Sequence, residues 1–481
     1  MSKTRTWRDY AAVKENKVIE DYVARFGLTS FKNEVPALLS FFYISGQVVA
    51  DFIRVPIWAS MLDPRVHVFW IQPTRTGKTI AWEFIGEVLR LAGVEVEGFT
   101  SGTDAGLIGT INTYEEDGQE VTVTTPGALA GKKALNFDEG SILLQGDKKA
   151  HSSETILYLQ QAMNPIGTDS NHMRKHMAKG LVETQSSVSF WITTYPPQGV
   201  KDVVLTKGLF QRVLLFVAHW DMEDRQEVSE RRMSGAFKNV MGDAASVEDL
   251  AAHFIQVREN CKTRLINLAL AGGHLTPPEH VDDWDAHDSY DLMSEEQQQK
   301  LAKAVMHDMF TINDRHDWDA SMLSCVDEFY GLLTGLDPQM KEIVCSFMPN
   351  VENYLVLFAV HIALTEQTWN LEGRHLEMSL EIIYDVYERL VTWLETDVEV
   401  GQKRREKMAR MSAWKHSYEL TNEHDLGKAG AGWMQKSEVF ANYMKREGKS
   451  KPATYDHYKK AKQWFTERKE GSVVYVRWKG E

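Results

Sequence analysis

Short apolar runs alternate with amphipathic segments between residues 66 and 220. The runs that we expect to be strands are residues 66–71, 94–100, 133–140, 187–194 and the second half of 208–219. Residues 81–91 and 153–163 show helical spacing between them. Strands that alternate with helices favour a mainly parallel sheet covered on both faces, so the predicted fold class is α/β.

The pattern becomes helical on both sides of this region. Apolar residues recur at helical spacing in residues 7–26, 35–53, 353–365 and 376–400. Residues 227–241 are polar and are interpreted as a linker, and residues 274–291, rich in Pro, His and Asp, as a loop. Within the α/β region, residues 111–125 predict a β-hairpin with Gly118 in its turn.

The end of the chain has a pattern of its own. Residues 434–447 and 455–470 predict two helices, and the apolar run S-V-V-Y-V-R-W then predicts a short strand. Two helices followed by a strand are typical of a small winged-helix module. The predicted organisation is a helical N-terminal segment, an α/β core, a helical lid region and a C-terminal winged helix, with boundaries at 1–60, 61–222, 223–400 and 401–481.

The loop after the first predicted strand carries the clearest chemical signal. Its sequence Q-P-T-R-T-G-K-T matches most of the P-loop pattern G-x-x-x-x-G-K-[ST], with Gln72 in place of the first glycine. Backbone N–H groups near Gly77 can surround a phosphate, Lys78 can neutralise it, and the Thr79 hydroxyl can bind Mg²⁺. The candidate nucleotide-binding residues are Gln72, Pro73, Thr74, Arg75, Thr76, Gly77, Lys78 and Thr79.

Acidic and hydroxyl residues end two further predicted strands. Asp138 and Glu139 close the third strand, where the first acid could bind Mg²⁺ and the second could orient the attacking water. Thr193 and Thr194 close the fourth strand, and in a parallel sheet they would lie beside the P-loop. Alternatively, the two acids cap a helix and the threonines only end a β-branched strand.

Two groups of basic residues are further candidates. Arg212 precedes the last strand and is either a surface residue or a residue that reaches a neighbouring subunit's γ-phosphate. Arg174, Lys175 and Lys179 lie in a segment that could follow a nucleic-acid backbone or form a solvated surface.

Composition and charge narrow the class of protein. The 481 residues are 43% hydrophobic and 25% charged, which is ordinary for a globular protein. No long apolar run predicts a membrane span, and the first residues lack a secretory pattern, so we expect a cytoplasmic protein. Residues 401–481 carry 19 Lys and Arg against 10 Asp and Glu, so this +9 segment follows an acidic body in a chain of net charge −14. An acidic partner such as nucleic acid, or a solvated tail, would fit this segment.

The order of these motifs resembles the AAA+ ATPase core, and within it the MCM-like and superfamily III helicase branch. The similarity extends over about residues 63–220. It is strongest from A-G-L-I-G-T at Ala105 through G-A-L-A at Gly127 to N-F-D-E-G at Asn136. Similar ATPase domains occur in proteins of phages and plasmids. This sequence departs from the pattern at Gln72 and at Thr194, where the family has glycine and asparagine. Because residues 1–60 predict helices, we expect no counterpart of the oligonucleotide-binding domain of MCM proteins in them.

The resemblance implies roles for the candidate residues. Lys78 and Thr79 would form Walker A and Asp138 and Glu139 Walker B, while Thr194 would be sensor 1 and Arg212 an arginine finger acting in trans. The implied protein is an ATP hydrolase, a ring-shaped homo-oligomer, expected to be a hexamer, that uses ATP and Mg²⁺ to translocate on DNA as a replicative helicase in the cytoplasm of its cell or host. The alternative is an AAA+ loading or assembly factor that binds DNA or protein without unwinding.

Overall fold

The computed structural model describes residues 7–29, 32–57, 60–99, 104–116, 119–138, 140, 151–177, 180–195, 208–218, 220, 222–233, 244–277, 284–334, 336, 338–396, 410–421 and 432–479. The chain divides into two compact units, residues 1–394 and residues 395–481, which are described separately. The segments predicted as N-terminal helices, α/β core and helical region all belong to the first unit and share one cluster of buried apolar residues.

A five-stranded parallel sheet forms the centre of the first unit. Its order is β11-β3-β10-β7-β4, with bounds Leu214–Val217, Val68–Ile71, Ser189–Thr194, Ala134–Phe137 and Val96–Phe99. Every residue of β3, β7, β10 and β11 is buried, which explains why these strands read as continuous apolar runs. The predicted α/β fold with a parallel sheet is confirmed.

The register of the sheet aligns the carboxyl ends of its central strands. Ile71 lies opposite Thr194 on one side and Val217 on the other, and Phe137 lies opposite Ile192. After β3 the chain crosses to β4 at one edge of the sheet, and after β10 it crosses in the opposite direction to β11 at the other edge. Ligands of open α/β sheets bind at such a point, where connections from neighbouring strands diverge.

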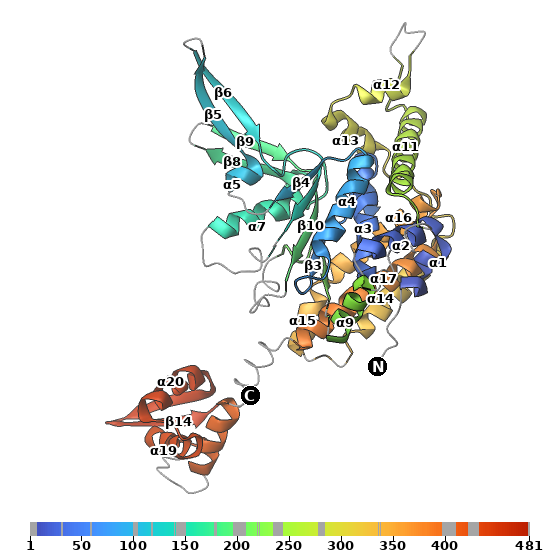
Figure 1. The fold of residues 1–481 in the computed structure, drawn as a ribbon. Helices are drawn as coiled ribbons and strands as arrows, with labels where there is room; N and C mark the ends of the chain where they lie inside the picture. Colours follow the sequence, from blue (N-terminus) through green and yellow to red (C-terminus); the bar gives the residue numbers. More distant parts are fainter. Residues whose placement is uncertain are drawn as a thin grey trace. The chain divides into compact units, whose positions relative to one another are not determined.

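Helices cover both faces of the sheet. Figure 1 shows α3 (Glu34–Val48) and α4 (Lys78–Leu91) on one side and α7 (His151–Ala162) on the other. Every residue of α3 after Glu34 is buried, and Tyr43 donates a hydrogen bond to the Ser189 carbonyl at the start of β10. The N-terminal helices are therefore part of the packing around the sheet.

The rest of the first unit is mainly helical. Its remaining helices are η1 (Trp7–Asp9), α1 (Ala11–Glu15), α2 (Lys17–Thr29), α5 (Asp104–Ile108), η2 (Asp169–Asn171), α9 (Met222–Met233), α11 (Val247–Ala271), α12 (Ala286–Asp291), α13 (Glu295–Ala304), α14 (Arg315–Gly331), α15 (Pro338–Cys345), α16 (Met348–Thr365) and α17 (Gly373–Thr396). Two predictions were wrong in part. The linker predicted over 227–241 begins inside α9, and its residues 234–241 lie outside the described residues. The loop predicted over 274–291 ends in α12, whose Asp285 cap accepts two backbone N–H bonds.

Within the described residues, three β-hairpins accompany the central sheet. The predicted hairpin at 111–125 is confirmed as β5 (Gly109–Glu116) paired with β6 (Gln119–Pro126), although Gly118 lies outside the described residues. The basic segment forms β8 (His172–Met177) and β9 (Gly180–Gln185), and β9 packs against β5. A shorter pair, β1 (Val55–Ile57) and β2 (Ser60–Leu62), precedes β3.

The second unit combines helices with a small antiparallel sheet. A helix at residues 410–421 is followed by β12 (Met434–Gln435), α19 (Lys436–Glu447), α20 (Lys451–Ala461), η3 (Lys462–Trp464), β13 (Phe465–Glu470) and β14 (Val473–Trp478). The strand order is β12-β14-β13 around a core that includes Trp414. The helix predicted over 455–470 was wrong in its last part, because residues 465–470 pair with β14 along their whole length.

A buried ion pair connects the start of β3 to its surroundings. The guanidinium of Arg65 binds both carboxylate oxygens of Asp63, at 2.8 and 2.9 Å, and donates to the carbonyls of Ala162, Asn164, Ser186 and Val188. Burial alone would raise the pKa of Asp63, but the adjacent Arg65 lowers it to about 2. This pair fixes the segments that enter β3 and β10.

None of the helices in the described residues is long and apolar enough to cross a membrane.

Replacing Arg65 with methionine should strongly destabilise the first unit, since it leaves the buried Asp63 carboxylate and several carbonyls without a donor. We expect the free energy of unfolding to fall by about 3–5 kcal/mol, measured by urea titration followed by circular dichroism. The matched control is Arg315→Met, which removes an ion pair with Asp319. The Arg315 side chain is 71% exposed and the Asp319 side chain 56% exposed. The control should change stability by less than about 1 kcal/mol, and equal losses in both variants would contradict the role of the buried pair.

Candidate nucleotide-binding site

A cavity of about 480 Å³ opens at the carboxyl edge of the sheet. It brings together the loop after β3, the end of β7 and the end of β10. The lining residues are Thr74, Arg75, Thr76, Gly77, Lys78, Thr79, Ile80, Asp138, Thr194 and Tyr195. The structure therefore gathers most of the residues that the sequence predicted for a phosphate site into one cavity.

The backbone of the loop has the conformation of a turn that enters a helix. Gly77 has φ of 91° and Arg75 has φ of 63°, both in the left-handed region. The Thr76 hydroxyl donates to the Pro73 carbonyl at 2.7 Å across this turn. The helix α4 begins directly at Lys78, so its first N–H groups and the positive end of its dipole face this end of the loop.

Lys78 is held across the loop by backbone carbonyls. Its ammonium group donates to the carbonyl oxygens of Gln72 and Pro73 at 2.7 and 2.8 Å. Burial lowers the pKa of Lys78 to about 8, although the nearby Asp138 carboxylate acts in the opposite direction. A phosphate in the cavity would offer this partly desolvated cation a stronger partner than two neutral carbonyls.

Asp138 is placed by β10. Its Oδ1 accepts a hydrogen bond from the Thr193 hydroxyl at 3.3 Å, and the N–H of Gly140 donates to the Thr193 carbonyl at 2.8 Å. A Cβ on Gly140 would lie 2.3 Å from a methyl group of Ile192, so only glycine fits there. Glu139, the predicted catalytic acid, lies outside the described residues.

Thr194 has a buried hydroxyl that lacks a hydrogen-bond partner. The residue is 2% exposed, lines the cavity, and uses its carbonyl to accept a bond from the Gln72 N–H at 3.0 Å. A buried hydroxyl without a partner is costly, which is why such groups often contact a ligand or water. Thr194 ends β10, the strand between β3, which leads to Lys78, and β7, which leads to Asp138.

The oxygen donors fit a magnesium ion bound together with a nucleotide. The Thr79 hydroxyl and the Asp138 carboxylate both line the cavity. The described residues contain no cluster of three His, Cys, Asp or Glu side chains that would bind a metal ion. Mg²⁺ usually takes one or two protein oxygens and completes its octahedron with phosphates and water, so this donor set suits a metal that arrives with its substrate.

Two lining residues and one supporting residue were missed by the sequence-based reasoning. Ile80 and Tyr195 follow predicted site residues directly, so their positions were available from the chain order. Asn33, which donates to the Thr76 carbonyl at 2.9 Å, lies 43 residues before it. No local pattern connects Asn33 with the loop, and only the folded structure brings them together.

Arg212 lies just before the amino end of β11, whereas the cavity at Lys78 lies at the carboxyl ends of the strands. Its side chain donates to the carbonyl of Gly208 at 2.7 Å and to Asn164 Oδ1 at 3.2 Å, and burial lowers its pKa. It lines a separate cavity of about 320 Å³ together with Asp63 and Arg65. Arg212 therefore lines a different cavity from the candidate phosphate-binding loop of its own chain.

The basic candidates of the second hairpin have partners within the chain. Arg174 forms an ion pair with Glu183, its cross-strand neighbour, at 2.9 Å. The Lys175 ammonium lies 5.8 Å from the centre of the Tyr158 ring. Lys179 lies outside the described residues.

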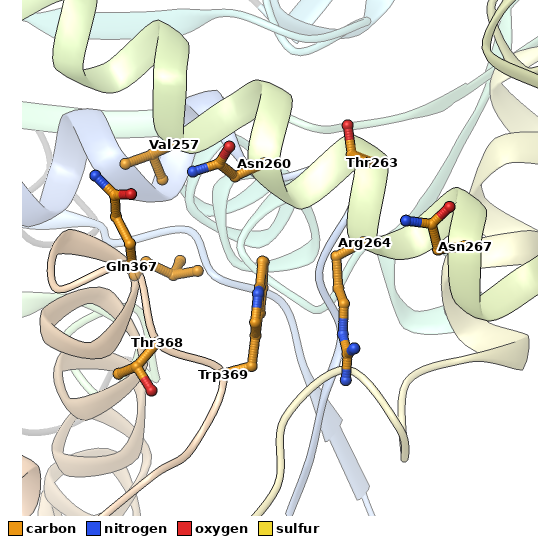
Figure 2. A pocket seen from close by; sticks show the side chains of 9 residues that line it. Val257, Asn260, Thr263, Arg264, Asn267, Gln367, Thr368 and Trp369 are labelled. Carbon is orange, nitrogen blue, oxygen red and sulfur yellow. The ribbon is translucent and has the colours of Figure 1, made fainter.

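Another cavity, of about 380 Å³, lies between α11 and the segment that follows α16. Figure 2 shows Asn260, Arg264 and Asn267 of α11 on one side and Trp369 on the other. The guanidinium carbon of Arg264 is 5.7 Å from the centre of the Trp369 ring. Amide and aromatic groups line this cavity without a carboxylate or a phosphate-binding loop, so it does not compete with the cavity at Lys78 as a nucleotide site.

Comparison of the sequence with models of known protein families gives no match, and comparison with curated protein sequences gives none either.

Proposed function

We propose that this protein is a Mg²⁺-dependent ATPase with its active site in the cavity at Lys78. The observation that carries the proposal is the convergence of a lysine at a helix start, a carboxylate and an unpartnered buried hydroxyl, from three strands, in one cavity. Each group matches one need of phosphoryl transfer: neutralisation of phosphate charge, metal binding and positioning of the γ-phosphate or water.

Each group in the cavity has a separate role in the proposed reaction. The N–H groups around Gly77 and the ammonium of Lys78 bind the β- and γ-phosphates, and Thr79 and Asp138 hold the metal. Bound Mg²⁺ would neutralise the negative charge that develops between the β- and γ-phosphates. The Thr194 hydroxyl contacts the γ-phosphate or the attacking water, and Glu139 orients that water.

The finer proposal is a DNA translocase of the AAA+ type that acts as a ring-shaped oligomer, expected to be a hexamer. Two adjacent hairpins, one carrying Arg174 and Lys175, support contact with a nucleic-acid backbone. The helix–strand–helix–helix–strand–strand order of the basic second unit supports a winged helix. The position of Arg212 on a surface away from its own phosphate loop supports a role toward a neighbouring subunit's nucleotide.

Replacing Lys78 with alanine should abolish ATP hydrolysis, because the phosphates lose their buried cation while the fold is kept. We expect kcat/KM to fall at least about a hundredfold, measured as phosphate release with Mg²⁺ present. Lys300→Ala is the control, since the Lys300 side chain is 74% exposed and pairs with Glu296 one helical turn earlier. Hydrolysis at the wild-type rate by a folded Lys78→Ala variant would remove the proposed active site.

Nucleotide affinity should depend on pH through Lys78. The ammonium is charged below its pKa of about 8 and becomes neutral above it. Affinity should therefore be constant up to that pH and then fall by up to about tenfold per pH unit. Titration with a fluorescent ATP analogue from pH 7 to 9.5 measures the slope, and in Lys78→Arg, whose guanidinium stays charged, the slope should disappear. The same slope in both proteins would show that another group titrates.

A forked duplex with a labelled strand separates helicase action from loading. We expect the wild-type protein to displace the strand with ATP and Mg²⁺, and the triple variant Arg174→Ala, Lys175→Ala, Lys179→Ala to lose about tenfold or more of this activity because the contacts to phosphate are lost. The readout is the displaced strand on a native gel, beside the rate of ATP hydrolysis with and without DNA. Hydrolysis that DNA stimulates without strand displacement would favour the loading or assembly factor.

A further inference from the structure

Asn33 occupies the N-cap of α3 but does not cap its own helix. Asparagine at this position normally accepts a hydrogen bond from an N–H of the first turn. Here its Oδ1 accepts from Gln72 Nε2 at 2.8 Å and its Nδ2 donates to the Thr76 carbonyl at 2.9 Å. The side chain is directed toward both ends of the phosphate loop.

Gln72 fixes which way the two amides point. The indole N–H of Trp70 can only donate, and it donates to Gln72 Oε1 at 2.5 Å. The NH₂ group of Gln72 must then face Asn33 Oδ1, so the NH₂ group of Asn33 faces Thr76. Gln72, Asn33 and Thr76 are 0%, 2% and 2% exposed, and water does not compete for these bonds.

The hydrogen bond from Asn33 to the Thr76 carbonyl controls the orientation of the Thr76–Gly77 peptide group, which borders the cavity. In a trans peptide the C=O of one residue and the N–H of the next point in opposite directions. Asn33 holds the C=O of Thr76 on the side of α3, away from the cavity that Thr76 and Gly77 line. The N–H of Gly77, with φ of 91°, is thereby turned to the opposite side, where a phosphate would lie.

The turn that carries Asn33 is anchored independently. Lys32, with φ of 55°, binds Asp224 at 2.6 Å and Glu227 at 2.5 Å, both on α9. The helix α9 follows β11, the edge strand beside β3. Asn33 therefore approaches the loop from a fixed support.

We propose that Asn33 and Gln72 are positioning residues of the nucleotide site, which hold the Thr76–Gly77 peptide so that its N–H meets a phosphate of the nucleoside triphosphate. This inference rests on the function proposed above. Gln72, which departs from the P-loop pattern, holds the loop in this conformation through its bonds to Trp70 and Asn33. The fixed N–H contacts phosphate equally in the ground state and the transition state, so it should contribute to KM and not to kcat.

The test compares Asn33→Leu, Gln72→Met and the double variant. Each single variant should raise the KM for ATP by about tenfold and leave kcat within about threefold of wild type. The double variant removes both partners of the Gln72–Asn33 bond, so its loss of thermal stability should be smaller than the sum of the two single losses, although the Trp70 N–H and the Thr76 carbonyl still lack their partners. Its KM should stay as high as in the single variants, because the Thr76 carbonyl remains untethered.

Gln47→Met is the matched control, since Gln47 is a buried amide of α3 that donates to the Ser187 carbonyl at 3.1 Å, before the start of β10 and away from the cavity. It should lose stability without a change in KM. A KM near the wild-type value in the folded double variant, or in either folded single variant, would overturn the inference. If Asn33→Leu does not fold, Gln72→Met carries the same expectation.

Failure of the proposed function gives a different result. In that case the wild-type protein neither binds a fluorescent ATP analogue nor hydrolyses ATP, and both proposals fall. If wild type binds nucleotide, Lys78→Ala does not, and the Gln72 and Asn33 variants behave as wild type, then only the positioning role is wrong.

Discussion

The hydrogen bond from the Gln72 N–H to the Thr194 carbonyl closes the ladder between β3 and β10, and the candidate site depends on it. This bond places the end of β10 against Gln72, the first residue of the loop Gln72–Thr79. The bond from Gly140 to the Thr193 carbonyl does the same for the end of β7. Two backbone bonds at neighbouring residues of one strand thus set the spacing between a lysine, a hydroxyl and a carboxylate that are far apart in sequence. Parallel pairing makes this possible because all the strands end at the same edge.

The sequence was sufficient for the elements whose signals are local. Val68–Ile71 and Ser189–Thr194 are continuous apolar runs, and burial on both faces of a parallel sheet requires that pattern. It was not sufficient where pairing decides the structure. Phe465–Glu470 has few apolar residues and was expected to be helical, yet it forms an edge strand because Val473–Trp478 offers it six paired positions. The strand order, which brings the ends of β3, β10 and β7 together at one cavity, is likewise set by contacts between distant segments.

Burial of polar groups limited the sequence-based reasoning in a second way. Asp63 and Arg65 were not singled out, because a charged pair before a strand usually lies at the surface. In the structure the pair is enclosed, and Arg65 satisfies four carbonyls from the segments around α7 and the start of β10. The chain approaches β3 through Asp63 and Arg65 and leaves it through Gln72, so polar residues with several buried partners fix the central strand at both ends.

Gln72 shows how a departure from a motif can follow from its surroundings. Glycine at that position would leave the Trp70 indole N–H and the Asn33 amide without their present partner. A buried donor without an acceptor costs about 1–3 kcal/mol, so the three side chains form a set in which no member can change alone without loss. The Gln72 side chain restricts the conformations of the loop, because the amides of Gln72 and Asn33 each have one orientation that satisfies their hydrogen-bond partners. The consequence is a loop at Gln72–Thr79, the candidate phosphate-binding loop, whose shape is determined by α3 as well as by its own glycine.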